Sequence, residues 1–252
     1  MEKIQTTGRY FIEVWRACGM DLENVEFVWA SDMVKNSEYW KLVLQIARTN
    51  SLKRFIRTAE IMGREESMDL TAAQIIYPCM QVADIFMLGA KITQLGMDQR
   101  KVNMLAREVG EILGYWKPVV ISHHMLMGLG KPEFAEASPG KPAADKVSRT
   151  IALKMSKSKP DTSIFMTDTL EDIKRKMNKA WAPEGEIKEN PVLEYCKYII
   201  FESLDRLNIN EMIIVRPEKW GGNIHVKTYA ELEQKYAAKE IHPQDLKMTV
   251  AH

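Results

Sequence analysis

Residues 73–122 read AQIIYPCMQVADIFMLGAKITQLGMDQRKVNMLAREVGEILGYWKPVVIS, and this stretch decides the fold because it alternates between two kinds of apolar pattern. The spacing over 73–88 and 97–113 predicts helices, whereas the short runs 90–95 and 118–122 are typical of buried strands. Helices and strands that alternate in this way indicate a parallel sheet with crossover helices. Two further apolar runs, 25–30 and 163–166, are expected to be strands as well. The fold class is therefore α/β, with a doubly wound sheet.

The segments outside this stretch are mainly helical. Helices are expected at 7–18 and at 38–62, the second one broken near residues 49–51 and ended by Gly63. After residue 167 the sequence predicts helices at 170–181, 190–201 and 229–239, with short strands at 212–215 and 224–226. We therefore expect an α/β domain over 1–167, followed by a mostly helical domain over 168–252.

The bulk composition excludes several classes of protein. The 252 residues carry 35 basic and 34 acidic side chains, so a nucleic acid would have to be bound by a local basic face rather than by the net charge of +1. Cys18, Cys79 and Cys196 form no C-x-x-C pair, which argues against zinc, an iron–sulfur cluster or a disulfide framework. No apolar run approaches the ~20 residues of a membrane helix. A cytoplasmic protein without a bound metal is expected.

Three polar side chains share one face of the helix predicted at 73–88. Tyr77, Gln81 and Asp84 follow each other at helical spacing, and Pro78 is expected in the first turn, where its missing N–H has no cost. The rest of this helix is apolar, so the row should be buried and should need partners. A phenol, an amide and a carboxylate suit a small ligand with an ammonium group and a distant hydroxyl. A core network that satisfies itself is the alternative.

Two further motifs suit a nucleotide. Asp98, within Gly96-Met97-Asp98-Gln99, lies where a strand passes into a helix, and an acidic residue at that place suits a ribose hydroxyl; the alternative is a simple helix cap. The pentapeptide Lys154-Met155-Ser156-Lys157-Ser158 places ammonium groups on a short loop, where they suit a triphosphate whose charge is redistributed during reaction. The alternative for this loop is a solvated lysine cluster.

These motifs resemble one enzyme family. The pentapeptide is the signature loop of class I aminoacyl-tRNA synthetases, and residues 77–84 and 97–101 resemble the tyrosine branch of archaeal and eukaryotic type. The similarity continues through residues 190–191, 216–222 and 242–247. It implies a Rossmann-like catalytic domain and an anticodon-binding domain. It also implies the activation of tyrosine by ATP with substrate-bound Mg²⁺, transfer to tRNA(Tyr), and a homodimer.

The resemblance also implies roles for individual residues. The residues implied to assist catalysis are those of the signature loop: Lys154, Ser156, Lys157 and Ser158. The residues implied to bind tyrosine are Tyr77, Gln81, Asp84 and Gln99. The residues implied to bind ATP are Gly96, Asp98, His123, His124 and Met155, although a structural role is the alternative for the two histidines. The residues implied to contact tRNA are Arg57, Arg100, Trp220 and Asp245.

The chain departs from the family pattern at its beginning. The family's histidine-containing ATP motif is not found, and Leu95-Gly96 stands where the family has two glycines. We expect that the chain starts midway through the catalytic domain and needs a complementing N-terminal segment. Alone it should bind tRNA and tyrosine weakly and form little tyrosyl-adenylate. Two other functions stay open: a tryptophanyl-tRNA synthetase, which Asp84 argues against because an indole offers it no hydroxyl, and a non-catalytic tRNA-binding relative.

Overall fold

A computed structural model describes residues 2–59, 70–132 and 146–252, without the side chains at 57, 59, 146–148 and 151. The chain divides into two compact units. The first comprises Met1–Leu95 and Gln99–Ser122, and the second comprises Gly96–Asp98 and His123–His252. Each unit has its own hydrophobic core. No helix in the described ranges is long and apolar enough to cross a membrane.

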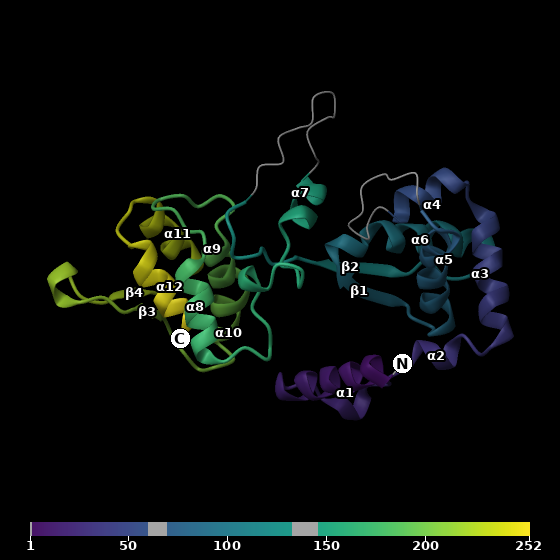
Figure 1. Cartoon of the computed structure of the whole chain (residues 1–252), viewed down its shortest axis with the longest axis horizontal. Coiled ribbons are helices and arrows are strands. Elements are labelled where there is room, and N and C mark those ends of the chain that lie inside the picture. The colour runs from purple at the N-terminus through teal and green to yellow at the C-terminus, as the bar shows by residue number, and fades with distance from the viewer. Residues whose placement is uncertain (1, 60–69, 133–145) are drawn as a thin grey trace, which may run out of the picture. The chain divides into compact units, whose positions relative to one another are not determined.

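The first unit is built mainly from helices (Figure 1). Its elements in chain order are α1 (Glu2–Ala17), η1 (Leu22–Asn24), α2 (Ala30–Met33), α3 (Ser37–Thr49), α4 (Leu52–Ala59), α5 (Ala72–Met87), β1 (Ile92–Gly96), α6 (Arg100–Leu113) and β2 (Val119–His123). The 3-10 turn η3 (Met97–Gln99) links β1 to α6. The predicted helices of this unit are confirmed, including the break after Thr49; the predicted end at Gly63 lies outside the described residues.

The core of the first unit lies between α3, α5 and α6. Each of these helices places buried apolar side chains at intervals of three or four residues, among them Leu42, Val82 and Leu105. Helix α3 begins at Asn36, whose side chain accepts a hydrogen bond from the N–H of Glu38. This cap fixes the first turn of α3, and the buried face of the helix starts in that turn.

Helix α5 starts earlier than the position of Pro78 suggested. Thr71 and Gln74 form a reciprocal capping box, so the helix begins at Ala72. The prediction that Pro78 stands in the first turn is therefore wrong, because this proline lies inside the helix and is buried. The predicted face is nevertheless retained, since Tyr77, Gln81 and Asp84 all belong to the same continuous helix.

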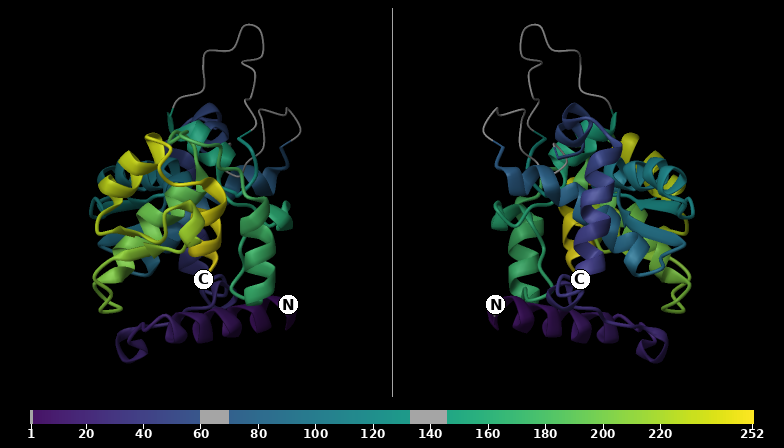
Figure 2. Two further views of the ribbon diagram at one scale, coloured as in Figure 1. Left: turned by 90° about the vertical axis from the view of Figure 1, so that its left-hand side faces the viewer. Right: turned by 90° about the vertical axis from the view of Figure 1, so that its right-hand side faces the viewer.

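The segment after α1 is not the buried strand that was predicted for 25–30. The N–H of Val25 donates to the carbonyl of Leu22, and Phe27 and Val28 are exposed. The segment runs back along α1 (Figures 1 and 2), where the rings of Trp15 and Phe27 stack with centroids 5.7 Å apart. Aromatic packing on a helix therefore replaces the pairing that a strand requires.

The sheet of the first unit is smaller than predicted. Strands β1 and β2 pair, and the N–H of Val119 donates to the carbonyl of Lys91 at 2.9 Å. The run 163–166 was also predicted as a strand, and this is wrong. Local turns use its backbone groups, because the N–H of Ser163 donates to Pro160 and the N–H of Phe165 donates to the side chain of Asp168. Within the described ranges, the doubly wound sheet is reduced to two of the four expected strands.

The second unit is mostly helical. Its elements in chain order are α7 (Lys146–Leu153), η4 (Pro160–Thr162), α8 (Leu170–Lys179), α9 (Pro191–Tyr195), the π-helix η5 (Cys196–Ile200), α10 (Phe201–Leu204), β3 (Met212–Ile214), η6 (Glu218–Trp220), β4 (Ile224–Val226), α11 (Tyr229–Ala237) and α12 (Pro243–Ala251). β3 and β4 pair antiparallel, with Ile213 opposite His225. The predicted helices and short strands after residue 167 are confirmed, and α12 is an additional helix.

Residues 123–167 belong to the second compact unit, although they were assigned by sequence to the first domain. The compact unit is defined by how closely its residues pack, whereas the predicted division between residues 167 and 168 separates two functions. The functional division therefore stays a prediction.

Candidate functional site

The carboxylate of Asp84 lies on α5 in the first unit, and its nearest polar partner is a residue that the sequence did not indicate. The hydroxyl of Tyr39, on α3, donates a hydrogen bond of 2.9 Å to Oδ1 of Asp84. Burial raises the pKa of the Asp84 carboxyl, and the hydrogen bond from Tyr39 opposes that increase. Among the described residues, no hydrogen bond reaches Oδ2 of Asp84. This oxygen can accept a hydrogen bond from a ligand hydroxyl.

The other members of the predicted row lie along the same helix. The side-chain amide of Gln81 donates to Oε1 of Gln99 at 3.3 Å, so two residues that were predicted for one ligand are in contact. Tyr77 is 45% exposed, which contradicts the expectation that the whole row is buried. Its exposure leaves the phenol accessible to a ligand. Sequence reasoning missed Tyr39 because its hydrogen bond spans 45 positions and no local pattern marks it.

The second unit brings together one residue predicted to bind ATP, Asp98, and one predicted to assist catalysis, Lys154. Nζ of Lys154 lies 2.7 Å from Oδ2 of Asp98, and the Asp98 residue is 9% exposed. Asp98 was expected to bind a ribose hydroxyl and Lys154 a triphosphate. In the structure the carboxylate of Asp98 and the ammonium group of Lys154 neutralise each other instead. A bound nucleotide would have to exchange this ion pair for its own contacts.

The signature loop is anchored by its backbone. Lys154 forms an antiparallel bridge with Met127, and the N–H of Met155 donates to the carbonyl of Leu126 at 2.8 Å. The hydroxyl groups of Ser156 and Ser158 lie 2.9 Å apart. Lys157 follows these anchors as an exposed side chain. The loop therefore holds Lys154 in place and leaves Lys157 accessible to an anion.

Gly96 lies directly against two side chains of this region. A Cβ atom at this position would lie 2.5 Å from Sδ of Met125 and 2.6 Å from Oδ1 of Asp98. Contacts this short do not occur between non-bonded atoms, so a side chain here would displace the Asp98 carboxylate. The thioether of Met125 and the carboxylate of Asp98 would therefore have to move to admit a side chain at position 96.

A backbone neighbour is less easily moved: at Gly110, on α6, a Cβ would lie 2.5 Å from the carbonyl oxygen of Trp116. Replacing Gly110 with alanine is therefore expected to lower the free energy of unfolding by about 1–3 kcal/mol, the usual cost of an overpacked position. The matched control is Gly128→Ala, because a Cβ there would meet its nearest atom at an ordinary 3.5 Å. That variant should change stability by under about 1 kcal/mol. Urea denaturation followed by circular dichroism measures both. Equal stability of the two variants would contradict the steric assignment.

The two histidines predicted for the ATP site differ in their surroundings. Nε2 of His124 lies 2.7 Å from a carboxylate oxygen of Glu194, and its ring stacks on Tyr198 at 4.3 Å. The second oxygen of Glu194 accepts a hydrogen bond from the N–H of Met127. His123 ends β2 and is exposed. His124 thus has the contacts of a structural residue, which was the alternative for this pair.

The residues predicted to contact tRNA lie at exposed positions where they are described. Trp220 ends the turn η6 and is 66% exposed, and Gly221 follows it with φ of 100°, a conformation that favours glycine. Arg216 supports this turn by donating to the carbonyl of Gly222 at 3.2 Å. Asp245 lies in the first turn of α12 and is partly exposed.

The two arginines predicted to contact tRNA belong to helices of the first unit. Arg100 is the first residue of α6 and is exposed. Arg57 belongs to α4, but its side chain lies outside the described part of the structure.

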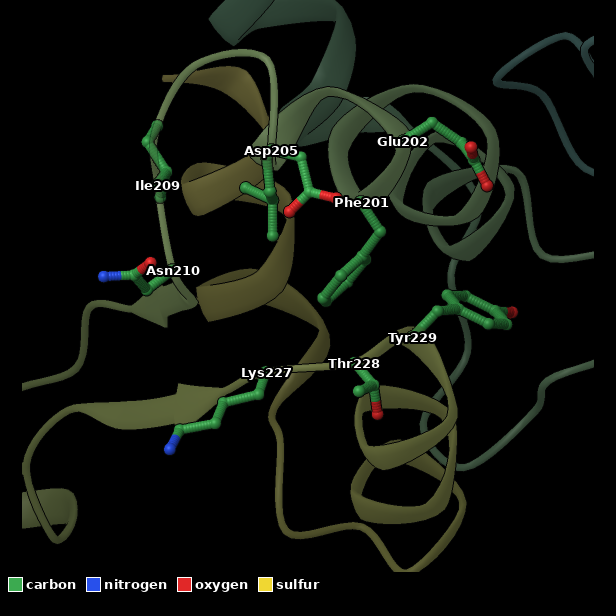
Figure 3. A pocket seen from close by; sticks show the side chains of 9 residues that line it. Phe201, Glu202, Asp205, Ile209, Asn210, Lys227, Thr228 and Tyr229 are labelled. Carbon is green, nitrogen blue, oxygen red and sulfur yellow. The ribbon is translucent and has the colours of Figure 1, made fainter.

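A cavity of about 420 Å³ lies in the second unit (Figure 3). Its lining includes Phe201, Asp205, Lys227 and Tyr229, and no predicted site residue contributes to it. Across the described residues, no cluster of three or more histidine, cysteine, aspartate or glutamate side chains is arranged to hold a metal ion.

Comparison with known proteins gives a consistent result along the whole chain. The family model for class I tRNA synthetases (W and Y) matches residues 1–252. Tyrosine–tRNA ligase 1, cytoplasmic, of Arabidopsis thaliana is 45% identical over 98% of this chain. The crystal structure of the tyrosyl-tRNA synthetase of Pyrococcus horikoshii, complexed with L-tyrosine, is similar with a TM-score of 0.82 and 38% identity over 92% of this chain.

The tryptophan branch is more distant. A tryptophanyl-tRNA synthetase of Encephalitozoon cuniculi, bound to tryptophan, has a TM-score of 0.58 and 18% identity over 99% of this chain, which shows a common fold alone. The chain spans 59% of the length of the Arabidopsis relative and 63% of the Pyrococcus structure.

Proposed function

Because the chain belongs to the class I tRNA synthetase family of the tryptophan and tyrosine enzymes, we propose that its protein is a tyrosine–tRNA ligase. It activates tyrosine with ATP and transfers the activated amino acid to tRNA(Tyr). The observation that carries the proposal is the row on α5, in which Asp84 keeps one carboxylate oxygen open beside Tyr39. The relatives at 45% and 38% identity are named as tyrosine enzymes, which supports the same substrate.

In this proposal the first unit selects the amino acid. The carboxylate of Asp84 accepts a hydrogen bond from the substrate phenol, while Tyr77 and Gln81 bind its ammonium group. Gln99 contacts the substrate near its carboxylate and orients Gln81 through their mutual hydrogen bond. A tryptophan side chain has no hydroxyl to offer Asp84, so a desolvated carboxylate would be left unpaired beside it.

ATP is the second substrate, and Mg²⁺ comes with its triphosphate. The tyrosine carboxylate attacks the α-phosphate and pyrophosphate leaves, a reaction that needs positioning and charge stabilisation rather than a general base. Lys154 and Lys157 stabilise the negative charge of the leaving pyrophosphate. Asp98 accepts a hydrogen bond from the ribose once Lys154 has moved to the phosphates. Met155 and the backbone around Gly96 line the nucleotide.

The helical part after residue 167 is proposed to bind the anticodon. Trp220 offers an exposed aromatic face on which a base can stack, and the Asp245 carboxylate can accept a hydrogen bond from the donor edge of a guanine-like base. Arg57 and Arg100 are proposed to contact the acceptor stem. Homodimerisation and a cytoplasmic location are part of the same proposal, and the name of the Arabidopsis relative supports the location.

The function is tested by pyrophosphate–ATP exchange with tyrosine or tryptophan as the amino acid. The chain is measured alone and after addition of the segment of the Pyrococcus relative that it does not match. Exchange that depends on tyrosine in either preparation is the expected result. Exchange that depends on tryptophan would identify the tryptophan enzyme. Exchange with neither amino acid, combined with binding of tRNA(Tyr), would identify a non-catalytic relative.

A further inference from the structure

The contact between Tyr39 and Asp84 joins two helices of the first unit in front of the proposed substrate hydroxyl. Tyr39 is 1% exposed, and its hydroxyl lies 2.9 Å from Oδ1 of Asp84 and 3.4 Å from the carbonyl of Met80. The ring also packs edge-on against Trp40, with centroids 5.6 Å apart. The phenol is therefore buried, and the shorter of its two hydrogen bonds goes to Oδ1 of Asp84.

A carboxylate held at one oxygen presents the other in a fixed direction. Rotation about the terminal bond of an aspartate is soft, so an unanchored carboxylate would sample many orientations. The hydrogen bond from Tyr39 removes this freedom and leaves Oδ2 to a ligand donor. Because a carboxylate accepts several hydrogen bonds, the contact with Tyr39 does not compete with a second donor.

In the same contact the hydroxyl of Tyr39 is the hydrogen-bond donor and the carboxylate of Asp84 is the acceptor. Burial and the neighbouring Asp84 raise the pKa of the Tyr39 phenol above its ordinary value, so the hydroxyl stays protonated. Tyr77 adds to this increase. The hydrogen-bond partner of the Asp84 carboxyl is thus the uncharged phenol of Tyr39 on α3.

We propose that Tyr39 is a positioning residue for amino-acid selection: it holds Oδ1 of Asp84 so that Oδ2 meets the substrate phenol. The inference rests on the proposed function, because it requires that Asp84 binds the hydroxyl of tyrosine. Tyr39 itself does not touch the substrate, so its effect is confined to ligands that carry this hydroxyl.

The test is a double-mutant cycle between Tyr39→Phe and Asp84→Ala, read by calorimetric titration with tyrosine and with phenylalanine. Tyr39→Phe should weaken tyrosine binding about tenfold, as expected for one hydrogen bond to a charged group, and should change phenylalanine binding by less than about twofold. In the Asp84→Ala background the same substitution should have no further effect. Replacing Tyr39 with para-aminophenylalanine, which keeps a donor, should restore tyrosine affinity.

The control is Tyr236→Phe in the second unit, where the buried phenol donates to the carbonyl of Pro183 at 2.9 Å. This variant also loses a buried hydroxyl and should bind tyrosine normally. Equal weakening for both ligands, or the same loss in the Asp84→Ala background, would overturn the assignment of Tyr39. If the unmodified protein does not prefer tyrosine over phenylalanine, the proposed function itself fails. If the unmodified protein prefers tyrosine and Asp84→Ala removes this preference, the proposed function stands. The result for Tyr39→Phe then decides whether Tyr39 is a positioning residue.

Discussion

Replacing Asp84 with alanine is expected to weaken tyrosine binding about a hundredfold, while ATP binding should change by less than about twofold. The carboxylate is partly desolvated and keeps one oxygen open, so a phenol that loses this acceptor also loses a hydrogen bond to a charged group. Calorimetric titration with each ligand gives both affinities. Because burial disfavours the charged form of Asp84, the substitution should not lower the stability of the protein by a comparable amount.

The matched variant for this prediction is Asp84→Asn. The amide oxygen of the asparagine can still accept a hydrogen bond from Tyr39 or from the substrate, but it carries no charge. The affinity of this variant for tyrosine should therefore lie between that of the unmodified protein and that of Asp84→Ala. Unchanged tyrosine affinity in Asp84→Ala would contradict the role of this residue. A parallel loss of ATP binding would show that the substitution disturbs the fold rather than the selection of tyrosine.

Replacing Lys154 with alanine is expected to lower tyrosine-dependent pyrophosphate exchange by ~10²–10³-fold, the usual effect of losing one preorganised charge at a reacting oxyanion. The loop anchors the backbone of Lys154, and its ammonium group already lies in a polar site, 2.7 Å from Asp98. Tyrosine binding should be unaffected, because that ligand is assigned to the row on α5. Steady-state exchange at varied ATP and tyrosine concentrations separates the two effects.

The control for Lys154 is Lys179→Ala, which removes an exposed lysine from the last turn of α8. A surface lysine with no role in the reaction should leave exchange within about twofold, since such substitutions have small effects. Retention of more than a tenth of the exchange rate in Lys154→Ala would argue that the signature loop does not act on the triphosphate.

The helical part of the fold was predictable because its signals are local. The apolar spacing in α3, α5 and α6 identified the core, and the polar row on α5 identified the residues that we propose to bind tyrosine. Gln81 and Gln99 are in contact, while their common ligand stays a prediction. A helix face is set by residues three and four positions apart, so one sequence is enough to define it.

The strands and the long-range contacts were less predictable. The run 25–30 has the composition of a strand, but a strand exists only with a partner, and Phe27 packs on Trp15 instead. The pairing of Tyr39 with Asp84 and of Lys154 with Asp98 depends on how distant segments meet. No periodicity within either segment carries that information. Sequence therefore indicated the side chains that we propose to bind the substrates, and it missed their long-range partners, such as Tyr39.

The most direct test of the central claim is the equilibrium binding of three amino acids to the unmodified protein. Tyrosine, phenylalanine and tryptophan differ in the group that they present to Asp84, and only tyrosine presents a hydroxyl in line with its ring. Tyrosine is expected to bind about a hundredfold more tightly than either of the others. Equal affinity for tyrosine and phenylalanine, or a preference for tryptophan, would contradict the assignment of the row on α5 as a tyrosine site.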